Sequence, residues 1–362
     1  MKKTLAVAAV LAAFAGTAAA DVTVYGKVDL GLGYLDKDGD SKVEMVSGGS
    51  STSRVGFKGS EKIGDMTVGF QYEGAVKADA GTGSFTDRIS MVNVKGAYGE
   101  IGAGRYGVLD SATGPYDIAA KMTSFGSGWY DTLGDQTFVM QTFSRIGNAV
   151  TYKTPSFGGV TLYAQVASNT STDDGEYTHE ADMYLGVGAT YQAGAFGANA
   201  VVSQMKWKNE AGRDNDALNI TAGVNYAFDF ATLYFAGNYY ENGYEGHDQY
   251  GLVLGAKAPV MGGTLHAMVG YGDVSGYTDG VAMVAADKAL ADAGQDADKI
   301  EAAQKAQEAA VKEEAEKMIV GVAYQYPLSK QTYVYGGAGW SQTKTSETVD
   351  QYEAVFGICH NF

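Results

Sequence analysis

The chain has 362 residues, of which 45% are hydrophobic, and it carries a formal net charge of −16. Its mean hydropathy of −0.14 excludes a bundle of membrane helices, and its acidic balance argues against nucleic-acid binding, which needs basic patches that neutralise phosphates. The single cysteine, Cys359, excludes an intrachain disulfide, so backbone pairing and packing have to stabilise the fold.

Residues 1–20 have the three parts of a secretory signal peptide. Lys2 and Lys3 make a basic start, a short apolar run follows, and small residues end at Ala20. The apolar run is too short to span a bilayer. We therefore expect cleavage after Ala20 and assign the fold to residues 21–362.

Short alternating strands fill most of the mature chain. Near its start, Val24, Val28 and Leu32 share one face, whereas Lys27 and Asp29 share the other. Alternation with a period of two is typical of a strand with one apolar and one polar face. It predicts sixteen strands, near residues 22–34, 51–61, 66–77, 85–97, 100–106, 146–154, 160–169, 179–193, 196–208, 214–228, 231–242, 247–258, 263–272, 318–326, 331–340 and 350–362.

The connections between these strands alternate in length. Tight turns such as 98–99 and 194–195 alternate with longer polar loops such as 36–50 and 170–178. A soluble sandwich would have turns of mixed length at both ends, whereas a transmembrane barrel has short turns at one end and long loops at the other. Such a barrel presents apolar residues to lipid and polar residues to a wet lumen, and it has no unpaired edge. We predict an all-β fold, a sixteen-stranded antiparallel transmembrane β-barrel.

Residues 107–145 form a connection far longer than the others around it. Structureless connections well beyond ~15 residues are usually functional in a chain of this kind. We expect this segment to fold into the barrel as a constriction loop and to narrow a water-filled pore.

Residues 273–317, the seventh outer loop, contain a helical insert. The stretch from Val281 onward is rich in Ala, Glu, Gln and Lys, and pairs such as Glu301 with Lys305 have the i,i+4 spacing that stabilises helices. We predict a helix from about Asp296 to Lys317. A solvated surface helix is the preferred interpretation, and a cap over the pore mouth is the alternative.

Several segments resemble one known family. These are Val-Tyr-Gly-Lys at 24–27, Ser-Arg-Val-Gly-Phe-Lys-Gly-Ser-Glu at 53–61, Gly-Arg-Tyr-Gly at 104–107, Ser-Arg-Ile-Gly-Asn-Ala-Val-Thr-Tyr at 144–152, and the ending Gly-x-x-His-x-Phe at 357–362. Together they are similar to the sixteen-stranded general diffusion porins of Gram-negative outer membranes, with the ending of beta-proteobacterial members. The resemblance implies a homotrimer among outer-membrane lipid and lipopolysaccharide, which lets small hydrophilic solutes and ions diffuse passively.

The resemblance also implies where a pore constriction lies. The family's basic wall maps onto Lys27, Arg54, Arg88 and Arg145, and alternation independently places Lys27 and Arg54 on the polar, lumenal face. The acidic partners on the loop would be Asp117, with Asp110 as the second choice and Asp131 further along. Opposite charges across a narrow aqueous gap create a transverse field.

The expected selectivity is a mild preference for cations. Thr86 stands where some relatives carry a lysine, so the basic wall is reduced, and the outer loops are acidic. The alternative is that the arginines only pair with carboxylates and set no selectivity.

The last strand carries an apolar stripe. Phe356, Ile358, His360 and Phe362 share one face. This stripe resembles the signal that the barrel assembly machinery reads.

Two alternatives to a general diffusion channel stay open. Trp129, Tyr130 and Phe138 could stack on sugars in a substrate-specific porin, and a structural or adhesive barrel could have a plugged lumen. An enzyme is not expected, nor any cofactor or metal, because the histidines share no catalytic arrangement or ligand spacing. The histidines are His179, His247, His266 and His360.

Overall fold

The computed structural model describes residues 22–168, 183–206, 216–242, 247–276, 286, 288–290, 292–294, 296–310 and 314–362. The expected signal peptide and its cleavage site lie outside the described residues. Among the described residues, no helix is long and apolar enough to cross a membrane.

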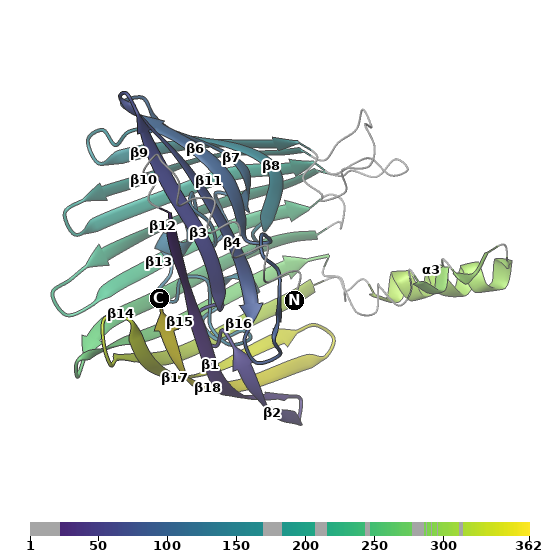
Figure 1. Ribbon diagram of the computed structural model, residues 1–362. Coiled ribbons are helices and arrows are strands. Elements are labelled where there is room, and N and C mark those ends of the chain that lie inside the picture. Colours follow the sequence, from purple (N-terminus) through teal and green to yellow (C-terminus); the bar gives the residue numbers. More distant parts are fainter. Residues whose placement is uncertain are drawn as a thin grey trace, which may run out of the picture.

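Antiparallel strands follow one another around a closed barrel, and most of them pair with both neighbours in sequence (Figure 1). They are β1 (Thr23–Lys37), β2 (Asp40–Ser47), β3 (Arg54–Ile63), β4 (Met66–Lys77), β5 (Thr82–Gly83), β6 (Ile89–Gly96), β7 (Gly99–Gly107), β8 (Arg145–Lys153), β9 (Val160–Ser168), β10 (Met183–Ala193), β11 (Phe196–Lys206), β12 (Asp216–Ala227), β13 (Thr232–Asn242), β14 (His247–Val260), β15 (Gly263–Ser275), β16 (Glu314–Pro327), β17 (Thr332–Lys344) and β18 (Thr348–Asn361). The helical elements with described bounds are η1 (Ala119–Met122), η2 (Gln136–Phe138) and α3 (Ala297–Ala310).

Sixteen strands close the barrel, as the sequence predicted. Two labelled pieces do not add to this number, because β2 and β3 pair with successive parts of β1 as one interrupted strand, and β5 is a two-residue piece beside β4. The first and last strands, β1 and β18, pair from Lys27 opposite Asn361 to Lys37 opposite Gln351. Gly26 and Phe362 then exchange two backbone hydrogen bonds, both 3.1 Å. Pairing of the last strand with the first closes the ladder into a ring, which is how a barrel avoids the free edges of an open sheet.

The second barrel strand differs from the prediction. Residues 36–50 were expected to form an outer loop, but β2 continues the ladder there and is joined to β1 by a tight turn at Asp38 and Gly39, which have φ angles of 51° and 88°. An Asp-Gly pair between two strands is a strong hairpin signal, because both residues tolerate positive φ. The ladder of this strand is interrupted between β2 and β3.

The two faces of the barrel have the polarity expected for a barrel in lipid. Outward apolar side chains stay exposed, with Phe356 at 67% and Leu32 at 57%, whereas the inward Gln165 and Gln249 are wholly buried. A soluble protein has the opposite arrangement, with apolar residues inside. This inversion is what a wall between hydrocarbon and a polar interior requires.

The insert forms a shorter helix than predicted. α3 ends at Ala310, and it projects beyond the strand ends (Figure 1). The predicted extension to Lys317 is wrong, because β16 begins at Glu314, and Glu316 bridges to Lys344 on β17 at 3.0 Å. Pairing with both neighbouring strands overrides the helical propensity of these residues.

Candidate functional site

The connection between β7 and β8, residues 108–144, lies inside the barrel. The Ser124 hydroxyl donates to the Ala267 carbonyl on β15 at 2.7 Å, and the Gln249 amide on β14 donates to the Val139 carbonyl at 2.7 Å. The loop therefore crosses the lumen to strands far from its own in sequence. Its fully buried apolar side chains are Val108, Leu109, Ile118, Met122, Leu133, Val139 and Met140. The apolar core of this protein thus lies largely between the loop and the inner wall.

Glycines on the inner wall make room for the loop. A Cβ atom added at Gly251 would lie 2.1 Å from the Val139 carbonyl oxygen, and one added at Gly337 would lie 2.7 Å from a Leu133 methyl carbon. Real Cβ contacts are not this short, so any side chain there would push the loop off the wall. The loop's position is therefore built into the strands it covers.

Asp110 anchors the start of the loop. Its fully buried carboxylate accepts hydrogen bonds from Asn219 at 2.6 Å, Ser203 at 2.9 Å and Tyr184 at 3.3 Å. Burial raises the pKa of Asp110 to about 6, and the hydrogen bonds from these partners oppose that rise. Asp110 therefore binds the loop to the wall, and in this structure it does not line the lumen.

The far part of the loop is tied to β17, β18 and β2. The Gln351 amide donates to the exposed Asp131 carboxylate, and the Thr132 hydroxyl donates to the Ser341 hydroxyl at 3.1 Å. The Tyr130 hydroxyl donates to Glu44 at 2.9 Å. Asp131 is not among the residues that line the arginine cavity described below.

The loop aromatics hold the loop in place. Trp129 is only 8% exposed, and its ring lies edge-on to that of Tyr335 with the centroids 5.4 Å apart and tilted to that of His266 with the centroids 5.5 Å apart. Tyr130 is also buried, whereas Phe138 is half-buried with the Lys317 ammonium 5.8 Å from its ring. Because the rings of Trp129 and Tyr130 are covered, the structure does not leave them open for the sugar stacking that the sequence suggested.

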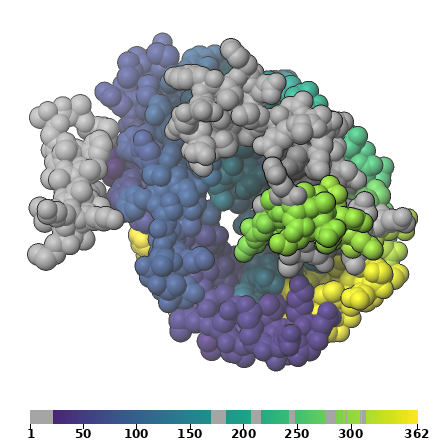
Figure 2. Space-filling model, turned by 90° about the vertical axis from the view of Figure 1, so that its right-hand side faces the viewer, coloured from purple at the N-terminus to yellow at the C-terminus, as the bar shows by residue number. Residues whose placement is uncertain are grey.

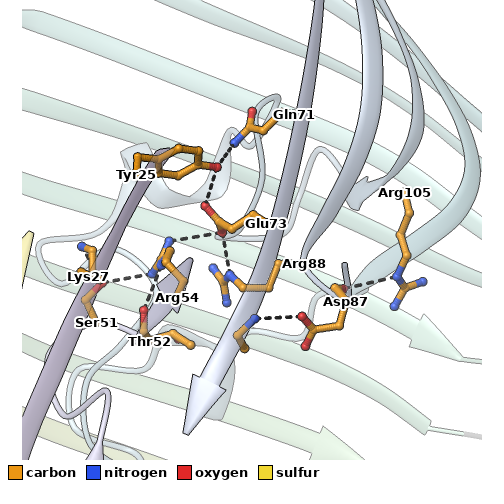
Figure 3. Close-up of polar contacts among 11 residues, drawn as sticks. Tyr25, Lys27, Ser51, Thr52, Arg54, Gln71, Glu73, Asp87, Arg88 and Arg105 are labelled. Carbon is orange, nitrogen blue, oxygen red and sulfur yellow. Dashed lines mark hydrogen bonds and ion pairs between the residues drawn. The ribbon is translucent and has the colours of Figure 1, made fainter. Parts of the chain in front are cut away.

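The predicted basic wall comes together at one cavity. Arg54, Arg88 and Arg145 line a space of about 280 Å³ with the loop residues Gly114 and Asp117. Lys27 lies beside this cluster and donates to the Ser51 hydroxyl at 3.1 Å (Figure 3). Burial raises the pKa of the half-buried Asp117, and nearby Lys121 opposes the shift. Of the three predicted acidic residues, only Asp117 lines the cavity with the arginines.

A second cavity continues toward the tight-turn end of the barrel. It has a volume of about 420 Å³ and is lined by Lys58, Lys95 and Glu100. Gln71 on β4 and Pro115 on the loop line both cavities. The two spaces therefore lie next to each other in the lumen, on either side of Gln71 and Pro115.

Sequence reasoning missed the group at the centre of the basic wall. Glu73 on β4 bridges to Arg88 Nε at 2.7 Å and to Arg54 Nη1 at 3.7 Å, and Tyr25 donates to it at 3.0 Å (Figure 3). The alternation of β4 places Gln71 and Glu73 on the polar face. That signal puts Glu73 in the lumen but does not say which residues of other strands it meets.

A family profile described as Gram-negative porin matches residues 6–346 of the chain. The protein is a Gram-negative porin. It is 31% identical to outer membrane porin protein 32 of Delftia acidovorans over 288 residues, which cover 72% of this chain and 77% of the relative. It is 29% identical to an outer membrane porin protein of Bordetella pertussis, over 65% of this chain and 68% of the relative.

Solved structures give the same fold. An anion-selective porin from Comamonas acidovorans superposes with a TM-score of 0.70 and 24% identity, and the alignment covers 95% of this chain and 100% of that chain. The porin is accordingly an outer-membrane channel protein. Its relatives are channels rather than enzymes.

Proposed function

We propose that the porin is a passive diffusion channel for small hydrophilic solutes and ions, which pass between the basic wall and residues 112–117 of the loop. The observation that carries this proposal is the pair of neighbouring lumenal cavities that share Gln71 and Pro115 in their linings. Viewed from the end that carries α3, an opening is visible beside that helix (Figure 2). Buried hydrogen bonds hold the loop against the opposite wall, and they support the proposal that the loop stays in one position during transport.

We also infer that the aperture prefers anions, and this replaces the mild cation preference expected from the sequence. Three arginines and two carboxylates, the buried Glu73 and the half-buried Asp117, line the first cavity, and two lysines accompany Glu100 in the second. Asp110, one of the expected acidic partners, is buried as an anchor. A net positive lining raises the local concentration of anions. The anion-selective porin of similar fold is consistent with this inference.

The sign of the reversal potential tests the proposed selectivity. For single porin channels in a planar bilayer under a KCl gradient, the reversal potential should have the sign expected when chloride permeates more readily than potassium. Replacing Arg88 with Gln should reduce the preference for chloride, because one lumenal charge is lost. Lys330→Gln, in the tight turn after β16, removes a charge away from both cavities and serves as the control. A wild-type preference for potassium would refute the inference.

The same recordings address the alternatives that the sequence left open. An adhesive barrel with a plugged lumen would show no stepwise conductance. A substrate-specific porin would show a current that a preferred solute blocks in a saturable way. The burial of Trp129 and Tyr130 disfavours stacking as the basis of such specificity.

We further propose that the porin is a homotrimer in contact with lipopolysaccharide and that its last strand carries the assembly signal. Phe356, Ile358 and Phe362 are exposed on the outer face, and His360 lies on the same face. An outward stripe is available to a machinery that acts on the barrel from outside the lumen. Gel migration of unheated, detergent-solubilised protein tests the oligomer.

A further inference from the structure

We propose that residues 48–53 form a second inward segment of the porin, and that Asp29 is the positioning residue that holds this segment against the barrel wall. The segment in turn holds Lys27 and Arg54 in place on the basic wall. This inference rests on the proposed diffusion path beside that wall, but its first test does not depend on conduction.

The inward segment lies where the second barrel strand leaves its ladder, between the end of β2 and the start of β3. Its sequence is Gly-Gly-Ser-Ser-Thr-Ser. The Ser50 hydroxyl lies 3.0 Å from the Tyr333 hydroxyl on β17, and a Cβ atom added at Gly49 would lie 3.0 Å from a Val355 methyl carbon on β18. The segment therefore crosses β1 on the inner face of the barrel and reaches the last two strands.

The Asp29 carboxylate, fully buried on the inner face of β1, is the anchor of this segment. Its Oδ2 atom accepts hydrogen bonds from the Ser50 amide at 3.1 Å, the Ser50 hydroxyl at 2.6 Å and the Ser51 amide at 2.9 Å. Its Oδ1 atom accepts from the Tyr335 hydroxyl at 2.5 Å. Burying a carboxylate is costly unless donors surround it, so the segment and its anchor stabilise each other.

The segment covers the single cysteine of the chain. Cys359 on β18 pairs with Asp29 on β1 and with Tyr333 on β17, so it lies between them on the inner face. The Ser50 side chain contacts both of these neighbours, and Cys359 is wholly buried. The thiol therefore reports whether the segment is in place.

The other side of the segment meets two cations of the basic wall. The Ser51 hydroxyl accepts from the Lys27 ammonium and from the Arg54 guanidinium, both at 3.1 Å. The Thr52 carbonyl accepts from Arg54 Nε at 2.9 Å (Figure 3). If the segment left the wall, both cations would lose these acceptors and become free to move beside the arginine cavity.

Asp29→Ala tests the anchor through the native thiol. Alanine leaves the Ser50 and Ser51 donors without their acceptor, so the segment should detach. In detergent-solubilised porin, Cys359 should react with a charged methanethiosulfonate about tenfold faster than in the wild type, because a thiol reacts only when it is exposed. Mass spectrometry of the intact chain measures the rate. Asp229→Ala, in the exposed turn between β12 and β13, is the control. Equal rates in Asp29→Ala and the wild type overturn the proposal.

Asp29→Asn distinguishes the hydrogen bonds from a general loss of packing. The asparagine oxygen can accept from Ser50 and Ser51, and its amide can donate to the Tyr335 hydroxyl. Cys359 should therefore stay as protected as in the wild type. A rate as high as that of Asp29→Ala would overturn the hydrogen-bonded anchor.

Gly49→Ala tests the same contact from the side of the segment, and it replaces Asp29→Ala if that variant does not assemble. The added methyl group would lie 2.5 Å from the Tyr335 hydroxyl oxygen and 3.0 Å from a Val355 methyl carbon. It should push the segment off the wall while Asp29 stays intact. Cys359 should again become reactive, and a protected thiol would contradict the close packing of the segment.

Open-channel noise tests the effect on the basic wall. In planar bilayers in dilute KCl, Asp29→Ala channels should show larger current fluctuations than the wild type, because Lys27 and Arg54 move beside the aperture. Ser51→Ala removes the shared hydroxyl but keeps the backbone amide that Asp29 binds, so the noise should rise while Cys359 stays protected. A purely stabilising residue would lower the melting temperature and leave the noise of assembled channels unchanged, and that result overturns the positioning role.

Failure of the proposed function is a separate result. Thiol labelling in detergent does not require a conducting channel. A porin without stepwise conductance would refute the diffusion channel, while the reactivity of Cys359 would still decide whether Asp29 holds the segment.

Discussion

Two aspartates of the loop between β7 and β8 show how burial separates anchoring from lining the lumen. Asp110 is fully buried and accepts three hydrogen bonds from β10, β11 and β12, whereas Asp117 is half-buried and lines the arginine cavity. Both are acidic residues of one loop, and the sequence ranked them as alternatives for one role. Their different surroundings assign them two roles.

The anchor formed by Asp110 should weaken as the pH rises. Its pKa in the folded porin, about 6, lies above the ordinary value of 3.8, so between these values the folded state binds more protons than the unfolded state. The anchor is therefore most stable below about pH 4 and loses roughly 3 kcal/mol by about pH 6 and above. Hydrogen exchange of residues 108–118, corrected for intrinsic rates, should show lower protection at pH 7 than at pH 4.

Asp110→Asn provides the matched control for this pH dependence. Asparagine has the same shape and no charge to bury, so protection of residues 108–118 should no longer depend on pH in this range. Protection that rises with pH in the wild type would contradict the assigned role of the carboxylate.

At the scale of elements, the loop between β7 and β8 and the inner wall depend on each other. The loop carries apolar side chains such as Leu133 and Val139, and the strands beneath them carry glycines. A wall of ordinary side chains would force the loop toward the aperture, because a close-packed interior cannot absorb extra atoms without strain.

Gly251→Ala should displace the loop. The new methyl group would meet the Val139 carbonyl oxygen at 2.1 Å, so we expect a loss of about 1–3 kcal/mol in stability. Residues 139 and 140 should move into the lumen and lower the single-channel conductance. The control is Gly336→Ala, whose methyl group would have its nearest neighbours at 3.7 Å. Equal conductance and melting temperature in the two variants would argue against the close approach.

The helical insert should be dispensable for conduction. α3 projects beyond the strand ends, and the opening is visible beside it (Figures 1 and 2). Replacing residues 286–310 with a short glycine-serine linker should leave single-channel conductance nearly unchanged. The deletion has to spare Glu314 and the residues after it, because β16 begins there. A large rise in conductance would show that the insert covers the mouth.

At the scale of the whole molecule, the two surroundings of the porin, lipid outside and water in the lumen, determine its architecture. Apolar side chains face outward, polar side chains face inward, and the loop supplies an apolar core inside the lumen. The last residue completes the ring of strands, because the backbone of Phe362 pairs with that of Gly26. The Phe362 side chain packs directly over this glycine, where an added Cβ atom would lie 2.6 Å from the phenylalanine ring.

Phe362→Ala should reduce the amount of assembled porin without changing the channel. The substitution removes an outward ring next to the closing pair, while the lumenal residues stay in place. Less heat-modifiable barrel should reach the outer membrane, whereas protein refolded in detergent should conduct as the wild type does. Val320→Ala, another outward apolar residue at 46% exposure, is the control. Equal membrane levels of the two variants would contradict the proposed assembly signal.

Local patterns in the sequence were sufficient to predict the class of fold and the family. Alternation with a period of two and turns of alternating length predict strands, faces and closure, because both reflect interactions between residues close in the chain. The two predictions that failed concern segments whose local sequence pattern was either left unused or overridden by pairing between strands. The hairpin at Asp38 and Gly39 carries a turn signal that the prediction of an outer loop left unused, and residues 314–317 have a helical pattern that pairing with β15 and β17 overrides.

The sequence by itself determined that residues 107–145 form a long segment within a membrane barrel and that Lys27 and Arg54 face its lumen. Only the tertiary structure decided which loop carboxylate anchors and which one lines the aperture, and that Glu73 lies among the arginines. These roles depend on burial and on distances between strands far apart in sequence, and alternation specifies the face of a residue but not its partner across the barrel.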